Sequence, residues 1–108
     1  MSLVTAHVLD ASLGTPAPGV TITLLGDDNT EIAQAVTNDD GRVPELGPQT
    51  LESGVYRITF GTGEYFANRN VETFYPSVVV DFTVDSGQKH YHIPLLLSPF
   101  AYSTYRGS

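Results

Sequence analysis

Apolar and polar side chains alternate with a period of two along most of this chain, and helical periodicity is nearly absent. In the segment VTAHVLD, Val4, Ala6 and Val8 share one face, whereas Thr5, His7 and Leu9 share the other. Such alternation is typical of β-strands that bury one side against a core. The pattern therefore predicts a protein built mainly of short, half-buried strands.

The same pattern predicts seven strands, which cover residues 3–12, 20–26, 31–37, 55–61, 77–85, 89–97 and 100–106. Segment 43–54 is predicted to be irregular, because its two prolines disfavour a central strand. Segment 63–70 is the one stretch predicted to form a short helix. Short strands with turn signals between them favour a two-sheet β-sandwich. We therefore expect an all-β sandwich with one short helix, formed as a single domain by residues 1–108.

The last two predicted strands are expected to pair as a hairpin. His90 and His92 lie on the face opposite the apolar residues, so both point away from the core. The expected pairing sets His92 opposite about Ser103 to Tyr105. It also brings Arg106 and Ser108 near the start of the histidine strand, unless the register slips by one residue.

Composition and charge narrow the range of partners. Twelve acidic residues against five basic ones give a net charge of −7, which argues against nucleic acid and against an anionic membrane surface. The absence of cysteine excludes disulfides and thiolate metal sites. No apolar run approaches the ~20 residues of a transmembrane helix. We expect a cytoplasmic protein without a signal peptide in this chain, although an upstream segment could have been removed.

Residue by residue, the candidate chemistry is sparse. His7 alone reads as a hydrogen-bonded structural histidine, and Arg42 reads as an exposed arginine after a turn. The spacing of His90 and His92 can chelate a metal, but no further ligand motif accompanies it, so a solvated strand face is the favoured interpretation. The chain contains no glycine-rich phosphate loop and no nucleophile elbow. We expect no metal site at these histidines.

Four stretches of the sequence are more informative in combination than any single residue. They are HVLDASLGTPA at 7–17, TNDDGR at 37–42, FYP at 74–76 and HYHIPLLLSPFAYSTYRGS at 90–108. Together they resemble the 5-hydroxyisourate hydrolase family, the enzymatic relatives of transthyretin. The resemblance runs through the whole chain. Its most specific element is the terminal YRGS, which distinguishes the hydrolases from the hormone carriers that share LLSP and YST.

The resemblance implies a transthyretin-like (prealbumin-like) fold and a homotetramer, a dimer of dimers with active sites at the dimer–dimer interface. It implies hydrolysis of 5-hydroxyisourate to 2-oxo-4-hydroxy-4-carboxy-5-ureidoimidazoline in urate degradation, by water attack on a lactam carbonyl without metal or cofactor. The implied catalytic residues are His7, Arg42, His92 and Ser108. The implied substrate-binding residues are His7, Arg42, Tyr105, Arg106, Gly107 and Ser108.

Within this set we expect His92 to be the general base and His7 to polarise the substrate or protonate the leaving nitrogen, with the reverse assignment open. The positive charge of Arg42 is expected to stabilise the oxyanion that forms when water attacks the carbonyl. Ser108 is expected to act through its hydroxyl or the terminal carboxylate. Two alternatives are a transthyretin-like carrier of small ligands without catalysis and a sandwich domain that contacts proteins through its tyrosines. Neither alternative accounts for the histidines and arginine together with YRGS.

Overall fold

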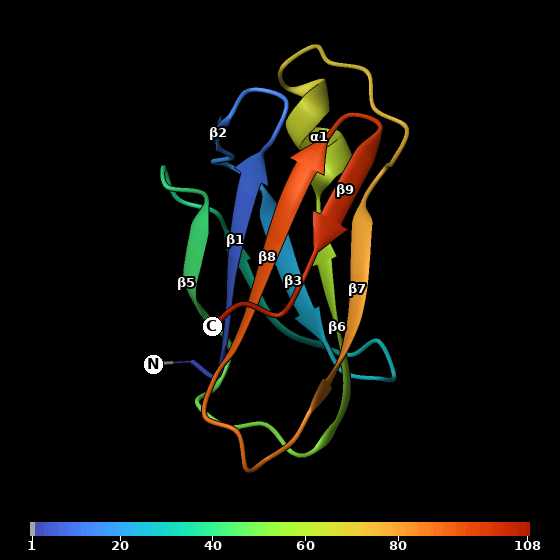
Figure 1. The fold of residues 1–108 in the computed structure, drawn as a ribbon. Helices are drawn as coiled ribbons and strands as arrows, with labels where there is room; N and C mark the ends of the chain where they lie inside the picture. Colours follow the sequence, from blue (N-terminus) through green and yellow to red (C-terminus); the bar gives the residue numbers. More distant parts are fainter. Residues whose placement is uncertain (1) are drawn as a thin grey trace.

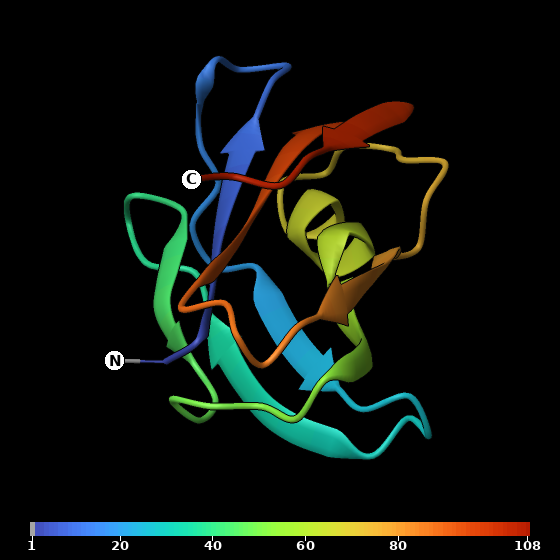
Figure 2. The same ribbon diagram turned by 60° about the horizontal axis from the view of Figure 1, so that its bottom comes forward.

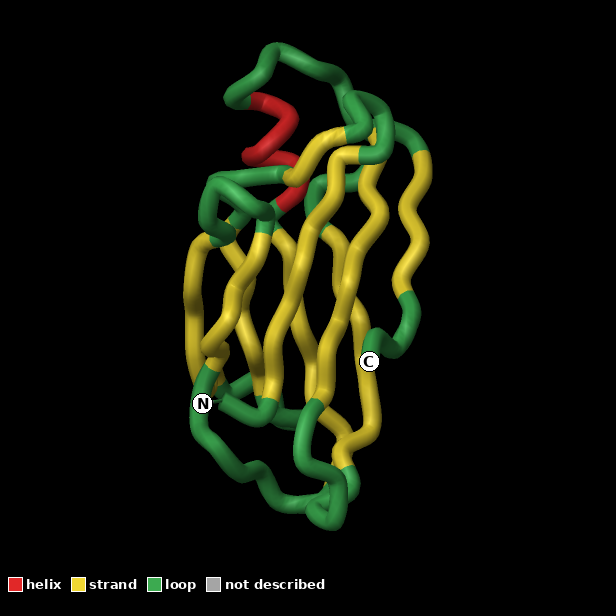
Figure 3. Tube along the Cα trace, turned by 60° about the vertical axis from the view of Figure 1, so that its left-hand side comes forward, coloured by secondary structure: helices red, strands yellow, loops and turns green. Residues whose placement is uncertain are grey.

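Two β-sheets packed face to face form the computed structural model, which describes residues 2–108 (Figures 1 and 3). The five-stranded sheet contains, in spatial order, β2 (Thr15–Pro16), β1 (Val4–Asp10), β8 (Tyr91–Ser98) and β9 (Ala101–Thr104), with β5 (Arg42–Leu46) also paired to β1. The four-stranded sheet contains, in spatial order, β4 (Glu31–Val36), β3 (Thr21–Leu25), β6 (Gly54–Phe60) and β7 (Val78–Val84). The expected two-sheet sandwich is confirmed.

The core lies between the sheets, as strand alternation requires (Figure 2). On β1, Val4, Ala6 and Val8 are buried, whereas Thr5 and His7 lie half-buried on the outer face. Each fully buried aliphatic side chain contributes about 1.5–3 kcal/mol to folding. The outer face of β1 therefore presents Thr5 and His7, followed by Leu9.

The single helix closes one end of the sandwich. It was expected at 63–70 and is observed as α1 (Thr62–Ala67), with Tyr65 and Phe66 buried. The helix stops early because the chain turns just beyond it, where Asn70 adopts a left-handed φ of 58°. No helix within residues 2–108 is long and apolar enough to cross a membrane.

The expectation of an irregular segment at 43–54 was wrong for its first part, because β5 pairs antiparallel with β1. Proline is tolerated there since β5 lies at the edge of its sheet, where a missing N–H leaves no neighbour unpaired. The pairing is also irregular there, because Pro44 and Glu45 both lie opposite Thr5, between the Val4–Leu46 and Ala6–Val43 pairs. Such a bulge accommodates a proline, which has no N–H for the ladder.

The hairpin of β8 and β9 exists, but the expected register was wrong. Ser98 pairs with Ala101, so only two residues form the loop, and His92 therefore lies opposite Gly107 rather than Ser103 to Tyr105. The loop consists of Pro99 and Phe100 and lies further along the chain than the expected pairing required. This position shifts the partner of each β8 residue towards the C-terminus. As expected, the end of the chain still lies along the start of the histidine strand.

Candidate active site

The register of three strands gathers the predicted residues on the outer face of the five-stranded sheet. His7 on β1 pairs with Arg42 on β5, and Thr5 on β1 pairs with His92 on β8. Thr5 and His7 are two residues apart, so they point to the same side. The rings of His7 and His92 lie near each other on this face, with centroids 6.5 Å apart and planes tilted by 35°.

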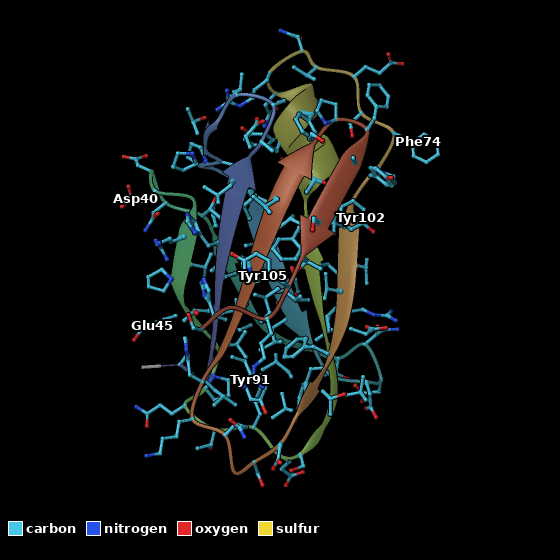
Figure 4. The ribbon with its side chains drawn as sticks, viewed as in Figure 1. Asp40, Glu45, Phe74, Tyr91, Tyr102 and Tyr105 are labelled. Carbon is cyan, nitrogen blue, oxygen red and sulfur yellow. The ribbon has the colours of Figure 1, made fainter. Side chains whose placement is uncertain are left out.

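His7 is oriented by a backbone carbonyl. Its Nε2 lies 2.9 Å from the carbonyl oxygen of Asp40, which sits in the turn before β5 (Figure 4). A carbonyl oxygen only accepts hydrogen bonds, so Nε2 carries the proton. In the neutral ring, Nδ1 is then the nitrogen with a free lone pair.

The turn that supplies this carbonyl is built by asparagine and glycine. The side-chain oxygen of Asn38 accepts the backbone N–H groups of both Asp40 and Arg42. Gly41 has φ of 72°, and a Cβ added there would lie 2.3 Å from the carbonyl oxygen of Val8. Only glycine combines that backbone conformation with so close an approach. The NDDGR stretch therefore positions both Arg42 and the partner of His7.

His92 is held on two sides of its ring. Nδ1 lies 2.7 Å from Oγ1 of Thr5, and a Cβ added at Gly107 would lie only 2.5 Å from Cδ2. Nε2 makes no hydrogen bond with any of residues 2–108, which leaves it available to a ligand. Burial lowers the pKa of His92, and the positive charges of Arg42 and of the other two histidines lower it further.

The end of the chain reaches this site because β9 stops where β8 contains a proline. β9 ends at Thr104, and Pro94 offers no N–H to the residue that would continue the ladder. The hydroxyl of Thr104 donates to the carbonyl of Pro94 instead. After two unpaired residues the backbone pairs again, with the N–H of Gly107 donating to the carbonyl of His92 at 2.9 Å.

The terminal residues fall on two sides of His92. Ser108 lines an open pocket of about 250 Å³ together with Thr5, Arg42 and His92. Tyr105 and Arg106 line a different groove of about 310 Å³, which lies between the two sheets and shares His92 (Figure 4). The guanidinium of Arg106 lies 4.6 Å from the centre of the Tyr91 ring. Within one chain, Tyr105 and Arg106 therefore line a different cavity from the one lined by Arg42 and Ser108.

Three contacts of the site were not anticipated from the sequence: Thr5 and His90 around His92, and the Asp40 carbonyl at His7. Alternation had already put Thr5 beside His7, and His90 beside His92. The parallel pairing of β1 with β8, which joins the two pairs, has no local signal in the sequence. In the described part of the chain, no three His, Cys, Asp or Glu side chains are grouped as a metal site.

Comparisons with known proteins identify the family of the chain. The family model HIUase/Transthyretin matches residues 4–107. A protein of Caenorhabditis elegans described as a probable 5-hydroxyisourate hydrolase is 49% identical over 97% of this chain and 81% of its own length.

Two solved structures have the same fold. The 5-hydroxyisourate hydrolase of Klebsiella pneumoniae superposes with a TM-score of 0.91 at 39% identity, covering 99% of this chain and 100% of that chain. Sea bream transthyretin in complex with thyroxine superposes with a TM-score of 0.88 at 35% identity, covering 97% and 94%. The sandwich is transthyretin-like, and the chain belongs to the HIUase/Transthyretin family.

Proposed function

We propose that this chain hydrolyses 5-hydroxyisourate to 2-oxo-4-hydroxy-4-carboxy-5-ureidoimidazoline, a step of urate degradation. The observation that carries the proposal is the gathering of His7, Arg42, His92 and Ser108 on one outer sheet face, with a free ring nitrogen on His92. The hydrolases among its relatives support the same reaction.

In the proposed mechanism, His92 is the general base. Its lowered pKa keeps the ring neutral at neutral pH, and Nε2 takes a proton from water while the water oxygen bonds to a lactam carbonyl carbon. A base placed in this way contributes about 10²–10⁴-fold to the rate. The carbonyl π electrons move to its oxygen, which becomes the oxyanion of a tetrahedral intermediate.

Arg42 and His7 act in the two later steps, which are stabilisation of the oxyanion and protonation of the leaving nitrogen. The planar guanidinium of Arg42 stabilises the oxyanion, a role in which one donor is worth about 10²–10³-fold. Collapse of the intermediate re-forms the carbonyl and breaks the C–N bond, and the leaving nitrogen takes a proton. Because Nε2 of His7 is bound to the Asp40 carbonyl, a protonated His7 would donate from Nδ1.

The terminal residues bind substrate in this proposal. Ser108 contributes a polar group to the pocket of Arg42 and His92. Gly107 allows the backbone to pass against the His92 ring. Tyr105 and Arg106 flank His92 from its other side.

We further propose that residues 1–108 form one hydrolase domain, which assembles as a dimer of dimers with its active sites between dimers. The pocket of one chain, at about 250 Å³, is open and below the roughly 300–1,000 Å³ of usual small-molecule sites. A second chain over this face would supply the missing wall and exclude water. Light scattering tests the assembly, with an expected mass four times the 11.7 kDa of one chain.

The reaction is tested by generating 5-hydroxyisourate enzymatically and following its absorbance. We expect the protein to accelerate the decay above the spontaneous rate, and His92→Asn or Arg42→Gln to lower kcat by about 10²-fold or more. Arg57→Gln is the matched control, because Arg57 lies on the other sheet, 2.8 Å from Asp81. A carrier without catalysis would leave the decay at its spontaneous rate, and that result would refute the proposed hydrolysis.

A further inference from the structure

We propose that Thr5 and His90 are positioning residues that hold His92 in the tautomer with Nε2 unprotonated. The inference rests on the proposed function, since it explains how His92 becomes a base. The carrying observation is a chain of two short contacts across β1 and β8. Oγ1 of Thr5 lies 2.7 Å from Nδ1 of His92 and 3.0 Å from Nε2 of His90.

Counting donors leaves two arrangements for this chain of contacts. A threonine hydroxyl has one hydrogen, so it donates to one of the two rings and accepts from the other. If Thr5 donates to His90, it accepts from Nδ1 of His92. The neutral His92 ring then has its lone pair on Nε2, where a substrate water can reach it. If Thr5 donates to His92, the proton of that neutral ring is on Nε2, and His92 cannot act as a base.

His90 selects between the two arrangements. A His90 ring with its proton on Nδ1 has a lone pair at Nε2, so it accepts the Thr5 hydrogen and sets His92 in the basic tautomer. A His90 ring with its proton on Nε2 would donate to Thr5 instead, and Thr5 would then turn its hydrogen towards Nδ1 of His92. The basic tautomer of His92 therefore requires that His90 accepts from Thr5.

The surroundings favour a neutral His92 and fix its ring. Its half-buried position and the nearby positive charges oppose protonation, and Thr5 and Gly107 hold opposite edges of the ring. The charged or titratable groups on the elements around the chain of contacts include His7 and Asp10 on β1, Arg42 and Glu45 on β5, Lys89 just before β8 and Tyr91 at its start, Tyr102 on β9, and Tyr105, Arg106 and the Ser108 carboxylate after β9. Arg106 reaches the His90 carbonyl at 3.5 Å, so its charge also faces His90.

The first test reads the tautomer directly and needs no substrate. Nitrogen-15 NMR of the histidine rings distinguishes Nδ1–H from Nε2–H. We expect His92 to carry its proton on Nδ1 at pH 8. Thr5→Ser keeps the hydroxyl and should preserve this tautomer, whereas Thr5→Val, of similar shape, and His90→Leu should each allow the Nε2–H form of His92 to appear.

The second test is kinetic. Thr5→Val should lower kcat for 5-hydroxyisourate by roughly tenfold, the size of one lost orienting hydrogen bond, with KM little changed. Thr5→Ser should restore most of the rate. Thermal unfolding of both variants verifies that they are folded, and the serine variant keeps the test decisive if the valine variant is unstable.

The outcomes separate the two proposals. A His92 that carries Nε2–H at pH 8, or a Thr5→Val protein with unchanged tautomer and kcat, would overturn the positioning role even if the wild type is an active hydrolase. Conversely, a wild type that leaves 5-hydroxyisourate at its spontaneous decay would refute the function, while the NMR result would still decide the tautomer.

Discussion

At His92, burial and positive neighbours act in the same direction. Both disfavour the imidazolium, so the pKa of His92 falls below its ordinary value of 6.5. A base must be unprotonated to act, and a lowered pKa keeps it so over a wider range of pH. The cost is a weaker intrinsic basicity, which the proposed site offsets with Arg42 at the oxyanion.

The first prediction concerns pH. The neutral ring of His92 is the active form. Therefore kcat/KM should stay constant as the pH falls through 6.5 and should decrease only at lower pH. Arg42→Gln removes one positive neighbour, so the pKa of His92 should rise towards 6.5 in an NMR titration. Arg57→Gln should leave it unchanged. An equal titration midpoint in wild type and Arg42→Gln would contradict the electrostatic part of this account.

The second prediction concerns Gly107. A methyl group there would meet the Cδ2 edge of His92 at 2.5 Å, so Gly107→Ala must displace the ring or the terminal segment. We expect kcat to fall by about 10²-fold, because a displacement of about 1 Å in a catalytic group has that cost. Gly87→Ala is the control, since its added Cβ would lie at an ordinary 3.5 Å from Asp85. Full activity in Gly107→Ala would show that the ring position is not critical.

At the scale of elements, β1 is tied to α1 by a buried pair. The hydroxyl of Tyr65 donates to the carboxylate of Asp10 at 2.8 Å, and Ser12 and Leu13 also donate to it. Burial alone would raise the pKa of Asp10, but these hydrogen bonds hold it below its ordinary 3.8. Burial, and then the bond to Asp10, raise the pKa of Tyr65 to about 12. This pair fixes the end of the strand that carries Thr5 and His7.

The third prediction rests on that pair. Tyr65→Phe should lower the free energy of unfolding at pH 7 by about 1.5–3 kcal/mol, the worth of a hydrogen bond to a charged group. The depressed pKa of Asp10 contributes stability above pH 3.8, which is lost as pH falls through its folded value. Tyr65→Phe makes that pKa less depressed, so the loss of stability on acidification should be smaller.

Urea unfolding at neutral and acidic pH measures both effects. Tyr56→Phe is the matched control, because its hydroxyl donates to the exposed carbonyl of Glu52 and its loss should cost less. If Tyr65→Phe were no less stable than Tyr56→Phe, the buried pair would not be what anchors β1 to the helix.

At the scale of the whole molecule, the site is assembled from both ends of the chain and from its middle. β1 and β5 contribute His7 and Arg42, β8 contributes His92, and the segment after β9 crosses β8 to end beside β1 (Figures 1 and 2). The whole face is open in one chain. A site of this kind is sensitive to residues added beyond Ser108 and to any chain that covers the face.

The fourth prediction tests the terminal segment. Deleting residues 105–108, or extending the chain beyond Ser108, should abolish turnover of 5-hydroxyisourate, because the first removes the Gly107 contact and the second fills the Arg42 pocket. The fold should persist, since Tyr105, Arg106 and Ser108 are exposed. Activity and thermal unfolding measure the two effects. An extended chain with the rate of the original would contradict the role of the terminus.

Alternation alone determined which residues of each strand face the core, because the side-chain period of a strand is a local property. It put Thr5 and His7 on one side of β1, and His90 and His92 on one side of the segment that begins β8. The family resemblance named the residues of the proposed site and the sandwich that carries them. Local rules were wrong at Pro44, which an edge strand tolerates, and at the turn between β8 and β9, which lies later in the chain than expected.

Only the tertiary structure decided which strands are neighbours. The pairing of β1 with β8 is parallel and joins strands from opposite ends of the chain, so it depends on the closure of the whole sandwich. That pairing sets Thr5 between two histidines, and the turn at Gly41 aims the Asp40 carbonyl at His7. Tautomers depend on such contacts over distances of about 3 Å. For that reason the sequence identifies the histidines of the site, but it does not indicate which ring nitrogen of each one carries the proton.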